Sequence, residues 1–167
     1  YFLTGIHPRN ITNDLETGDV GHLLAPHLKN PRCLGLGEIG LETARAREKA
    51  IFAQQLALGS MLKSKEMRIG IHTPRQNKLE ITREIFGILK AYPGLEEIAV
   101  IDHCNAETAG WVLKSGYWAG ITLNSVKASV SDLEKIVKRY SNMVNKIMCN
   151  TDSGSVFHED LYRLTQD

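Results

Sequence analysis

Residues 35–42 read Gly35-Leu36-Gly37-Glu38-Ile39-Gly40-Leu41-Glu42. This apolar, glycine-punctuated run places one carboxylate, Glu38, near the far end of what we expect to be a buried strand. A lone ionised carboxylate in such a place costs several kcal/mol unless a partner compensates its charge. A bound metal ion would be such a partner, so the run predicts a charged site at the end of a strand.

Other short apolar runs end in residues with similar chemistry. The residues at or near their ends are His7, His72, His103 and Asp152. From His7 through Glu38 and His72 to His103, these residues recur at intervals of roughly 30, which is the length of one βαβ unit. The longer interval before Asp152 holds one short unit and one ordinary unit. Each side chain is therefore expected at the carboxyl end of a strand.

Strand and helix patterns alternate along the whole chain. We expect strands at residues 1–6, 33–39, 67–72, 98–103, 117–123 and 146–151. Helical patterns lie at 14–29, 43–66, around 81–88, at 105–114 and from a capping box at 131–134, and a last helix starts near 156. The stripe in 43–66 is the most regular, whereas Pro26 is expected to break the first helix.

This alternation predicts an α/β fold of the (β/α)8 TIM-barrel type, with about six of the eight βα units present. Such barrels carry their active sites at the carboxyl ends of the strands. We expect a single domain over residues 1–167, incomplete at its N-terminal side, because the chain begins at Tyr1 within an apolar run.

Composition narrows the classes of protein further. The 167 residues are 43% hydrophobic and 23% charged, which excludes a disordered or fibrous chain. The net charge of +1 predicts no strong basic field. No apolar run is long enough for a membrane span, and no signal peptide opens the chain. The three cysteines lie far apart, which favours a reducing, cytoplasmic setting.

Two histidines and two carboxylates at one mouth predict a site for divalent metal ions such as zinc, magnesium or manganese. Such a site can activate water for hydrolysis. Each residue also has a structural explanation: His72 or His103 could be an ordinary loop residue, and Asp152 could only cap the next helix. Their coincidence at matching strand ends favours Glu38, His72, His103 and Asp152 as metal ligands, with Asp152 and Glu38 as catalytic residues.

Basic side chains near the strand ends are candidates for binding substrate. His7, Arg75 and Lys78 are the residues we assign to this role, and Arg9 and Lys127 also lie in or near such loops. Arginine and lysine there could hold a phosphate group. Ordinary surface charge explains each one equally well.

Several motifs together resemble the TatD family of metal-dependent nucleases. The matching pieces are Gly5-Ile6-His7-Pro8, Gly37-Glu38-Ile39-Gly40-Leu41, Ile71-His72-Thr73, His103-Cys104 and Thr151-Asp152-Ser153. They occur in the family's order over nearly the whole chain. The stretch from Asp102 to Thr108, with Gly120-Ile121-Thr122, is most similar to a TatD-related branch of predicted metal-dependent barrel hydrolases.

The resemblance implies a metal-dependent hydrolase that cuts DNA phosphodiesters. By that resemblance Glu38 would bridge two divalent ions, and His72 and His103 would bind one of them. Asp152 would bind the other and position the attacking water. The expected substrate is DNA or a small phosphodiester.

The chain also departs from the family pattern. The family opens with a strand carrying a His-x-His or His-x-Asp pair, which does not occur in these residues, and a second strand and a final helix are not recognised either. Asn150 and Gly154 stand where the family has an acidic residue and a proline. We expect the leading metal ligands to lie outside this sequence.

Two alternative functions remain open at this point. One is an amidohydrolase-type enzyme that cleaves C–N or C–O bonds at the same metals. The other is a non-catalytic barrel that binds a phosphorylated ligand or a partner. The native metal and the oligomeric state do not follow from the sequence.

Overall fold

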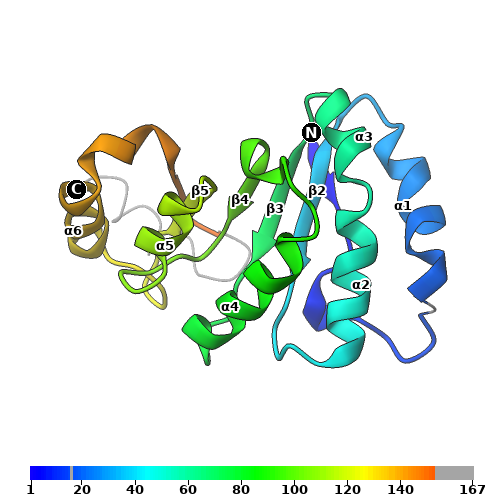
Figure 1. Cartoon of the computed structure of the whole chain (residues 1–167), viewed down its shortest axis with the longest axis horizontal. Helices are drawn as coiled ribbons and strands as arrows, with labels where there is room; N and C mark the ends of the chain where they lie inside the picture. Colours follow the sequence, from blue (N-terminus) through cyan, green and yellow to red (C-terminus); the bar gives the residue numbers. More distant parts are fainter. Residues whose placement is uncertain (16, 153–167) are drawn as a thin grey trace.

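The computed structural model describes residues 1–15 and 17–152. Six strands form one sheet, and every neighbouring pair is parallel. They are β1 (Phe2–Thr4), β2 (Cys33–Gly40), β3 (Arg68–His72), β4 (Ala99–Ile101), β5 (Trp118–Thr122) and β6 (Ile147–Asn150). They lie side by side in chain order (Figure 1), so β1 and β6 are the outer strands and the sheet is open among the described residues. The expected alternation of parallel strands and helices is confirmed.

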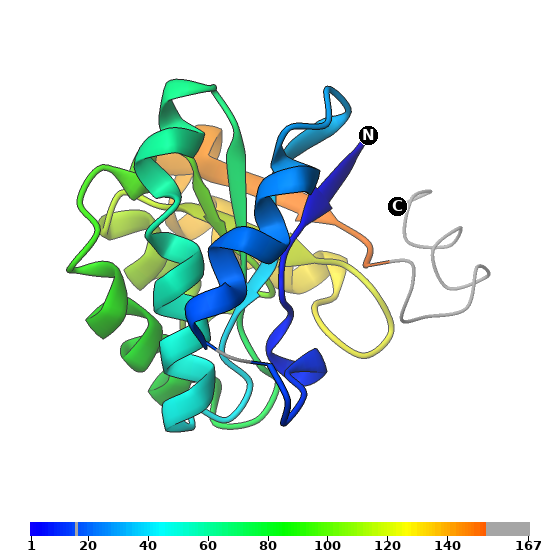
Figure 2. The same ribbon diagram turned by 90° about the vertical axis from the view of Figure 1, so that its right-hand side faces the viewer.

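Helices connect successive strands. They are α1 (Val20–Leu28), α2 (Ala46–Leu56), α3 (Gly59–Ser64), α4 (Lys78–Leu89), α5 (Ala109–Lys114) and α6 (Val130–Arg139). Short 3-10 helices lie at Pro8–Asn10, Thr17–Asp19, Leu95–Glu97 and Ser141–Lys146. In Figures 1 and 2, α1, α2 and α4 lie next to one another across one face of the sheet. Because every neighbouring pair of strands is parallel, the carboxyl ends of the strands lie at one edge of the sheet.

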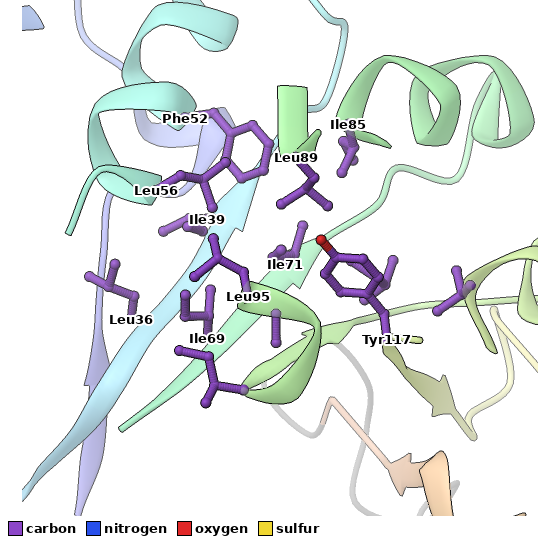
Figure 3. Packing of buried hydrophobic residues seen from close by; sticks show 14 of the residues in the cluster. Leu36, Ile39, Phe52, Leu56, Ile69, Ile71, Ile85, Leu89, Leu95 and Tyr117 are labelled. Atoms are coloured by element: carbon purple, nitrogen blue, oxygen red, sulfur yellow. The ribbon is translucent and has the colours of Figure 1, made fainter. Parts of the chain in front are cut away.

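The hydrophobic core lies between this helical layer and the sheet. Ile39, Ile69 and Ile71 of the central strands are fully buried, and they pack with residues such as Phe52 and Ile85 from the helices (Figure 3). Burying each such side chain contributes about 1.5–3 kcal/mol. The core therefore fixes β2 and β3, the two strands that carry Glu38 and His72.

The strands β2 and β3 approach each other closely at Gly40. Gly40 lies opposite His72 in the parallel register and has a φ of 141°. A Cβ atom there would lie 2.5 Å from the carbonyl oxygen of His72. Only glycine accepts both the positive φ and this contact without strain.

Some local expectations were wrong. The pattern at 43–66 forms two helices, α2 and α3, because the chain leaves the first helix at Ala57. The capping box is formed by Ser129 and Asp132, so its serine lies two residues before the expected one. Ser129 has the extended backbone conformation that an N-cap needs. Pro26 lies inside α1 without ending it.

Two further differences concern the ends of elements. The helix expected from 105 begins only at Ala109, since Asn105 instead closes a turn by accepting hydrogen bonds from the N–H groups of Glu107 and Thr108. The helix expected near residue 156 lies outside the described residues. Within the part of the chain that the structure describes, every helix is too short or too polar to cross a lipid bilayer.

Candidate metal centre

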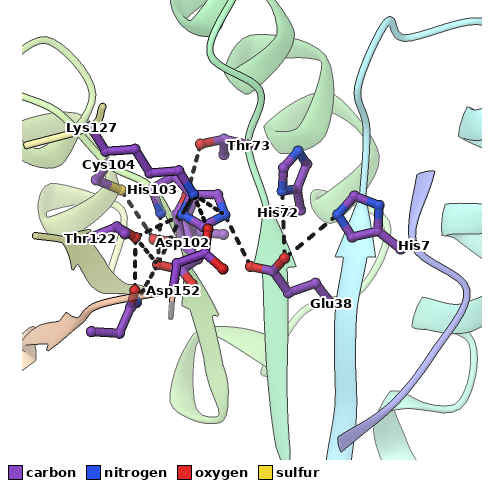
Figure 4. Close-up of polar contacts among 12 residues, drawn as sticks. His7, Glu38, His72, Thr73, Asp102, His103, Cys104, Thr122, Lys127 and Asp152 are labelled. Atoms are coloured by element: carbon purple, nitrogen blue, oxygen red, sulfur yellow. Dashed lines mark hydrogen bonds and ion pairs between the residues drawn. The ribbon is translucent and has the colours of Figure 1, made fainter. Parts of the chain in front are cut away.

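The carboxyl ends of the strands bring five polar side chains to one place (Figure 4). His7 follows β1, Glu38 lies in the last part of β2, His72 ends β3, His103 follows β4 and Asp152 follows β6. This edge is the one at which parallel α/β proteins place their functional groups. The sequence-based placement of these residues at strand ends therefore agrees with the structure.

Glu38 is the centre of the cluster. Its Oε2 atom lies 3.6 Å from Nε2 of His7 and 3.7 Å from Nδ1 of His72. Its Oε1 atom lies 3.1 Å from Nε2 of His103. One carboxylate thus faces three imidazole rings, which come from the ends of β1, β3 and β4.

Two groups of side chains at this centre have the spacing of metal ligands. One consists of His7, Glu38 and His72, and the other of Glu38, Asp102 and His103; within each group the potential ligand atoms lie within 4.8 Å of one another. Glu38 belongs to both groups and offers a different oxygen to each set of histidines. A carboxylate shared in this way is suited to bridging two ions.

The environment of His72 suits the binding of a metal ion by its Nδ1 atom. The side chain is 3% exposed, and its Nδ1 atom is buried without a hydrogen-bond partner. Because buried polar atoms are normally paired, such an atom requires an explanation. Donor atoms on one divalent ion, each about 2.1 Å from it, lie roughly 3.0–3.4 Å apart. The separations of 3.1 to 3.7 Å around Glu38 are close to that spacing, so these residues fit a divalent ion.

His103 is held by a polar network on its other side. Its Nδ1 atom lies 2.7 Å from Oγ1 of Thr122, whose hydroxyl donates to Oδ1 of Asn150 at 2.8 Å. Asp102 accepts hydrogen bonds from the His103 backbone N–H at 2.7 Å and from Nδ2 of Asn150 at 2.8 Å. His103 also has a φ of 58°, an unfavourable backbone conformation of the kind found at functional sites.

Asp152, which we expected to be a metal ligand, lies beside this network but belongs to neither group of potential ligand atoms. Its carboxylate forms an ion pair with Lys127. The Lys127 ammonium also lies 3.1 and 3.3 Å from the two ring nitrogens of His103. Asp152 has a φ of 47°, so it shares the left-handed backbone conformation of His103. The lysine therefore joins the expected catalytic carboxylate to the expected histidine ligand.

Both acidic residues of the 35–42 run are held in their ionised form. Burial opposes the ionisation of Glu38, but the surrounding imidazole rings, that of His103 foremost, outweigh it and keep the pKa of its carboxyl well below its usual range. Burial likewise raises the pKa of Glu42, and hydrogen bonds with Arg9 and His72 lower it by more. The centre thus offers anionic oxygen atoms to a cation.

Arg75 and Lys78 lie in the wall of a cavity that His103 also lines. Lys127 lines the same cavity, which has a volume of about 450 Å³ and whose wall also includes the acidic residues Glu107 and Asp132. Burial lowers the pKa of Lys78 to about 8. Its ammonium donates to Oγ1 of Thr73 at 3.0 Å. Three cationic side chains therefore face a space next to the centre.

Three residues of the centre were not identified from the sequence as site residues. Asp102, Glu42 and Thr122 are each bonded to a histidine that was. The dipeptide Asp102-His103 contained a signal, since an acidic residue beside a strand-end histidine is a potential ligand. His7, which we expected to bind substrate, lies in the ligand group of Glu38 and His72.

Comparison with known proteins places this geometry in context. The family model described as TatD related DNase matches residues 1–154. A curated protein of Methanocaldococcus jannaschii, described as an uncharacterized metal-dependent hydrolase, is 32% identical over 161 residues, which cover 96% of this chain and 60% of that protein.

A solved structure is also similar. The crystal structure of a TatD-like protein from Archaeoglobus fulgidus has a TM-score of 0.66 and 34% sequence identity, over 90% of this chain and 56% of that chain. This chain therefore spans somewhat less than two thirds of the length of both proteins. The likeness shows that the six-stranded sheet is of the TIM-barrel type.

Proposed function

This chain belongs to the TatD-related DNase family, and from that membership we propose that it is a divalent-metal-dependent hydrolase acting on phosphodiesters, of which DNA is the expected example. The family and the curated relative support metal-dependent hydrolysis. The choice of phosphodiesters is supported by the chemistry of the site.

One observation carries the proposal. The Glu38 carboxylate is shared between two groups of ligand-type side chains, and a buried nitrogen of His72 faces it without a hydrogen-bond partner. A purely structural ion-pair cluster would satisfy that nitrogen. Divalent ions held there would make water more acidic and would polarise a phosphoryl oxygen.

The protein groups have distinct roles in this proposal. Glu38, His7, His72 and His103 would hold the ions, with Asp102 next to His103. Asp152, oriented by its ion pair with Lys127, would accept a proton from the attacking water. The water oxygen would then bond to phosphorus while the bond from phosphorus to the leaving oxygen breaks.

The basic cavity supports a phosphate-bearing substrate. Arg75 and Lys78 face it from the segment after β3, and Lys127 faces it from the loop after β5. Arginine pairs with phosphate oxygens through two parallel hydrogen bonds, and lysine contributes a compact charge. We assign this cavity to a phosphate next to the one that is cut.

Hydrolysis assays with matched substrates test the proposal. The purified protein would be given double- and single-stranded DNA, a small phosphodiester, an amide and a lactone, each with added magnesium, manganese or zinc and with a chelator. We expect phosphodiester cleavage that the chelator abolishes and that Glu38→Gln and Asp152→Asn reduce strongly. Turnover confined to the amide or lactone would instead favour an amidohydrolase-type enzyme, and unchanged turnover in both variants would overturn the assigned site.

A further inference from the structure

The two ring nitrogens of His72 have opposite surroundings. Nε2 lies 2.8 Å from Oε2 of Glu42, whereas Nδ1 is buried, faces Glu38 and has no hydrogen-bond partner. The oxygen of Glu42 that faces Nε2 also accepts from Nε of Arg9, which can only donate, so it acts as a hydrogen-bond acceptor. The proton of the neutral imidazole therefore belongs on Nε2, and Nδ1 keeps its lone pair.

Glu42 is itself fixed by two groups. The Nε atom of Arg9 lies 2.9 Å from the same oxygen that His72 contacts. Behind it, the carboxylate of Glu48 accepts hydrogen bonds from the backbone N–H groups of Glu42, Thr43 and Ala44, at 2.9, 2.9 and 3.0 Å. Both the side chain of Glu42 and the backbone that carries it are thus held.

We propose that Glu42, oriented by Arg9, is a positioning residue that holds His72 with its Nδ1 lone pair directed at the Glu38 centre. This inference rests on the proposed function, because its purpose is to prepare a ligand for a divalent ion. Metal-binding histidines commonly donate their second N–H to a carboxylate, which fixes the tautomer and the ring orientation.

His103, the second histidine of the centre, is held by a different hydrogen-bond partner, Thr122. Because the Thr122 hydroxyl donates to Asn150, we assign the proton of the neutral His103 ring to Nδ1, which lies 2.7 Å from that hydroxyl. Nε2 then faces Glu38. His72 would therefore offer Nδ1 and His103 would offer Nε2 to the same carboxylate-bearing centre. Loss of Glu42 should disturb His72 and leave the tautomer of His103 unchanged.

Nitrogen-15 NMR of the histidine side chains reads the tautomer directly. In the wild-type protein we expect the signals of His72 to show a protonated Nε2 and an unprotonated Nδ1, both without metal and with zinc added. In Glu42→Ala the metal-free signals should shift toward a mixture of the two tautomers. The signals of His103 serve as an internal control.

Zinc affinity, measured by competition with a chelating dye, is the second readout. Removing an outer partner of this kind typically lowers metal affinity about 10–100-fold. We expect such a loss in Glu42→Ala and Glu42→Gln, and a smaller loss in Arg9→Met, which leaves the bond between Glu42 and His72 in place. Glu97→Gln is the matched control, because it breaks an exposed carboxylate pair with Lys63 far from the centre in sequence.

The outcomes separate this inference from the proposed function. Zinc binding within twofold of wild type in Glu42→Ala, with an unchanged His72 tautomer, would overturn the role of Glu42 and leave the metal centre standing. A wild-type protein that binds no zinc would overturn the proposed function, while the metal-free tautomer still tests Glu42. Thermal melts of each variant confirm that it is folded.

Discussion

Oε1 of Glu38 lies 3.1 Å from Nε2 of His103, although the two residues belong to strands that are not neighbours. Glu38 is in β2 and His103 follows β4, so the contact spans the width of β3. At the same time, the other oxygen of Glu38 faces His7 and His72. A change at this single carboxylate therefore affects both ligand groups.

Replacing Glu38 tests that dependence. Glu38→Gln keeps the size of the side chain and removes its charge, so we expect the content of divalent metal per chain to fall about tenfold or more. Elemental mass spectrometry on protein dialysed against metal-containing buffer measures it. Glu84→Gln, which breaks an exposed pair with Lys49, is the control. Equal metal content in Glu38→Gln and wild type would contradict the assignment.

Replacing Asp152 should separate chemistry from metal binding. Asp152 lies outside both ligand groups and is paired with Lys127, so Asp152→Asn leaves those groups intact. A positioned proton acceptor contributes about 10²–10⁴-fold to the rate, so we expect kcat to fall by about a hundredfold or more. The metal bound by the Glu38 groups should be retained. Steady-state kinetics on a small phosphodiester, at saturating metal, gives kcat, and an unchanged value would exclude Asp152 as the proton acceptor.

We expect substrate binding to depend on pH through the charge of Lys78. Its pKa is lowered to about 8, mainly by burial, so its ammonium is charged at neutral pH and loses the charge as the pH rises through 8. We therefore expect the KM for a phosphodiester to rise above about pH 8. Lys78→Arg keeps its charge throughout, because the arginine pKa is above 12, and should flatten this rise. Parallel rises in KM for wild type and Lys78→Arg would show that another group is responsible.

Two glycine substitutions should have opposite effects on stability. Gly40→Ala places a methyl group against the His72 carbonyl at an unfavourable φ, so we expect a loss of about 2 kcal/mol or more in the free energy of unfolding. Gly87→Ala lies in α4, and its new Cβ meets nothing within 4 Å. It should stabilise by about 0.5–1 kcal/mol. Urea denaturation of both variants measures the difference, and a neutral Gly40→Ala would contradict the close approach of β2 and β3.

The fold was largely predictable because it depends on local patterns. Alternating apolar runs and helical stripes gave the six parallel strands, and the family resemblance gave the TIM-barrel type. The break between α2 and α3 was missed because the apolar stripe continues from Ile51 in α2 through Leu58 in the break to Leu62 in α3. Hydrophobic spacing alone does not reveal where backbone hydrogen bonding is interrupted.

The ligand-type residues were predictable for the same reason, whereas their partners were not. Glu38, His72 and His103 end recognisable strands, so parallel pairing brings them together. The bond between Glu42 and His72 depends instead on the register that places Gly40 opposite His72, and the sequence does not specify register. The ion pair between Lys127 and Asp152 likewise depends on the path of the loop after β5.

The carboxylate of Glu48 should slow the motion of the segment after β2. It ties down three successive amide groups in the segment after β2, and connecting segments of this kind are ordinarily among the more mobile parts of a protein. These amides should exchange with deuterium only when the start of α2 opens, and therefore slowly. The arrangement around Glu42 would then belong to the resting protein, formed before any substrate arrives.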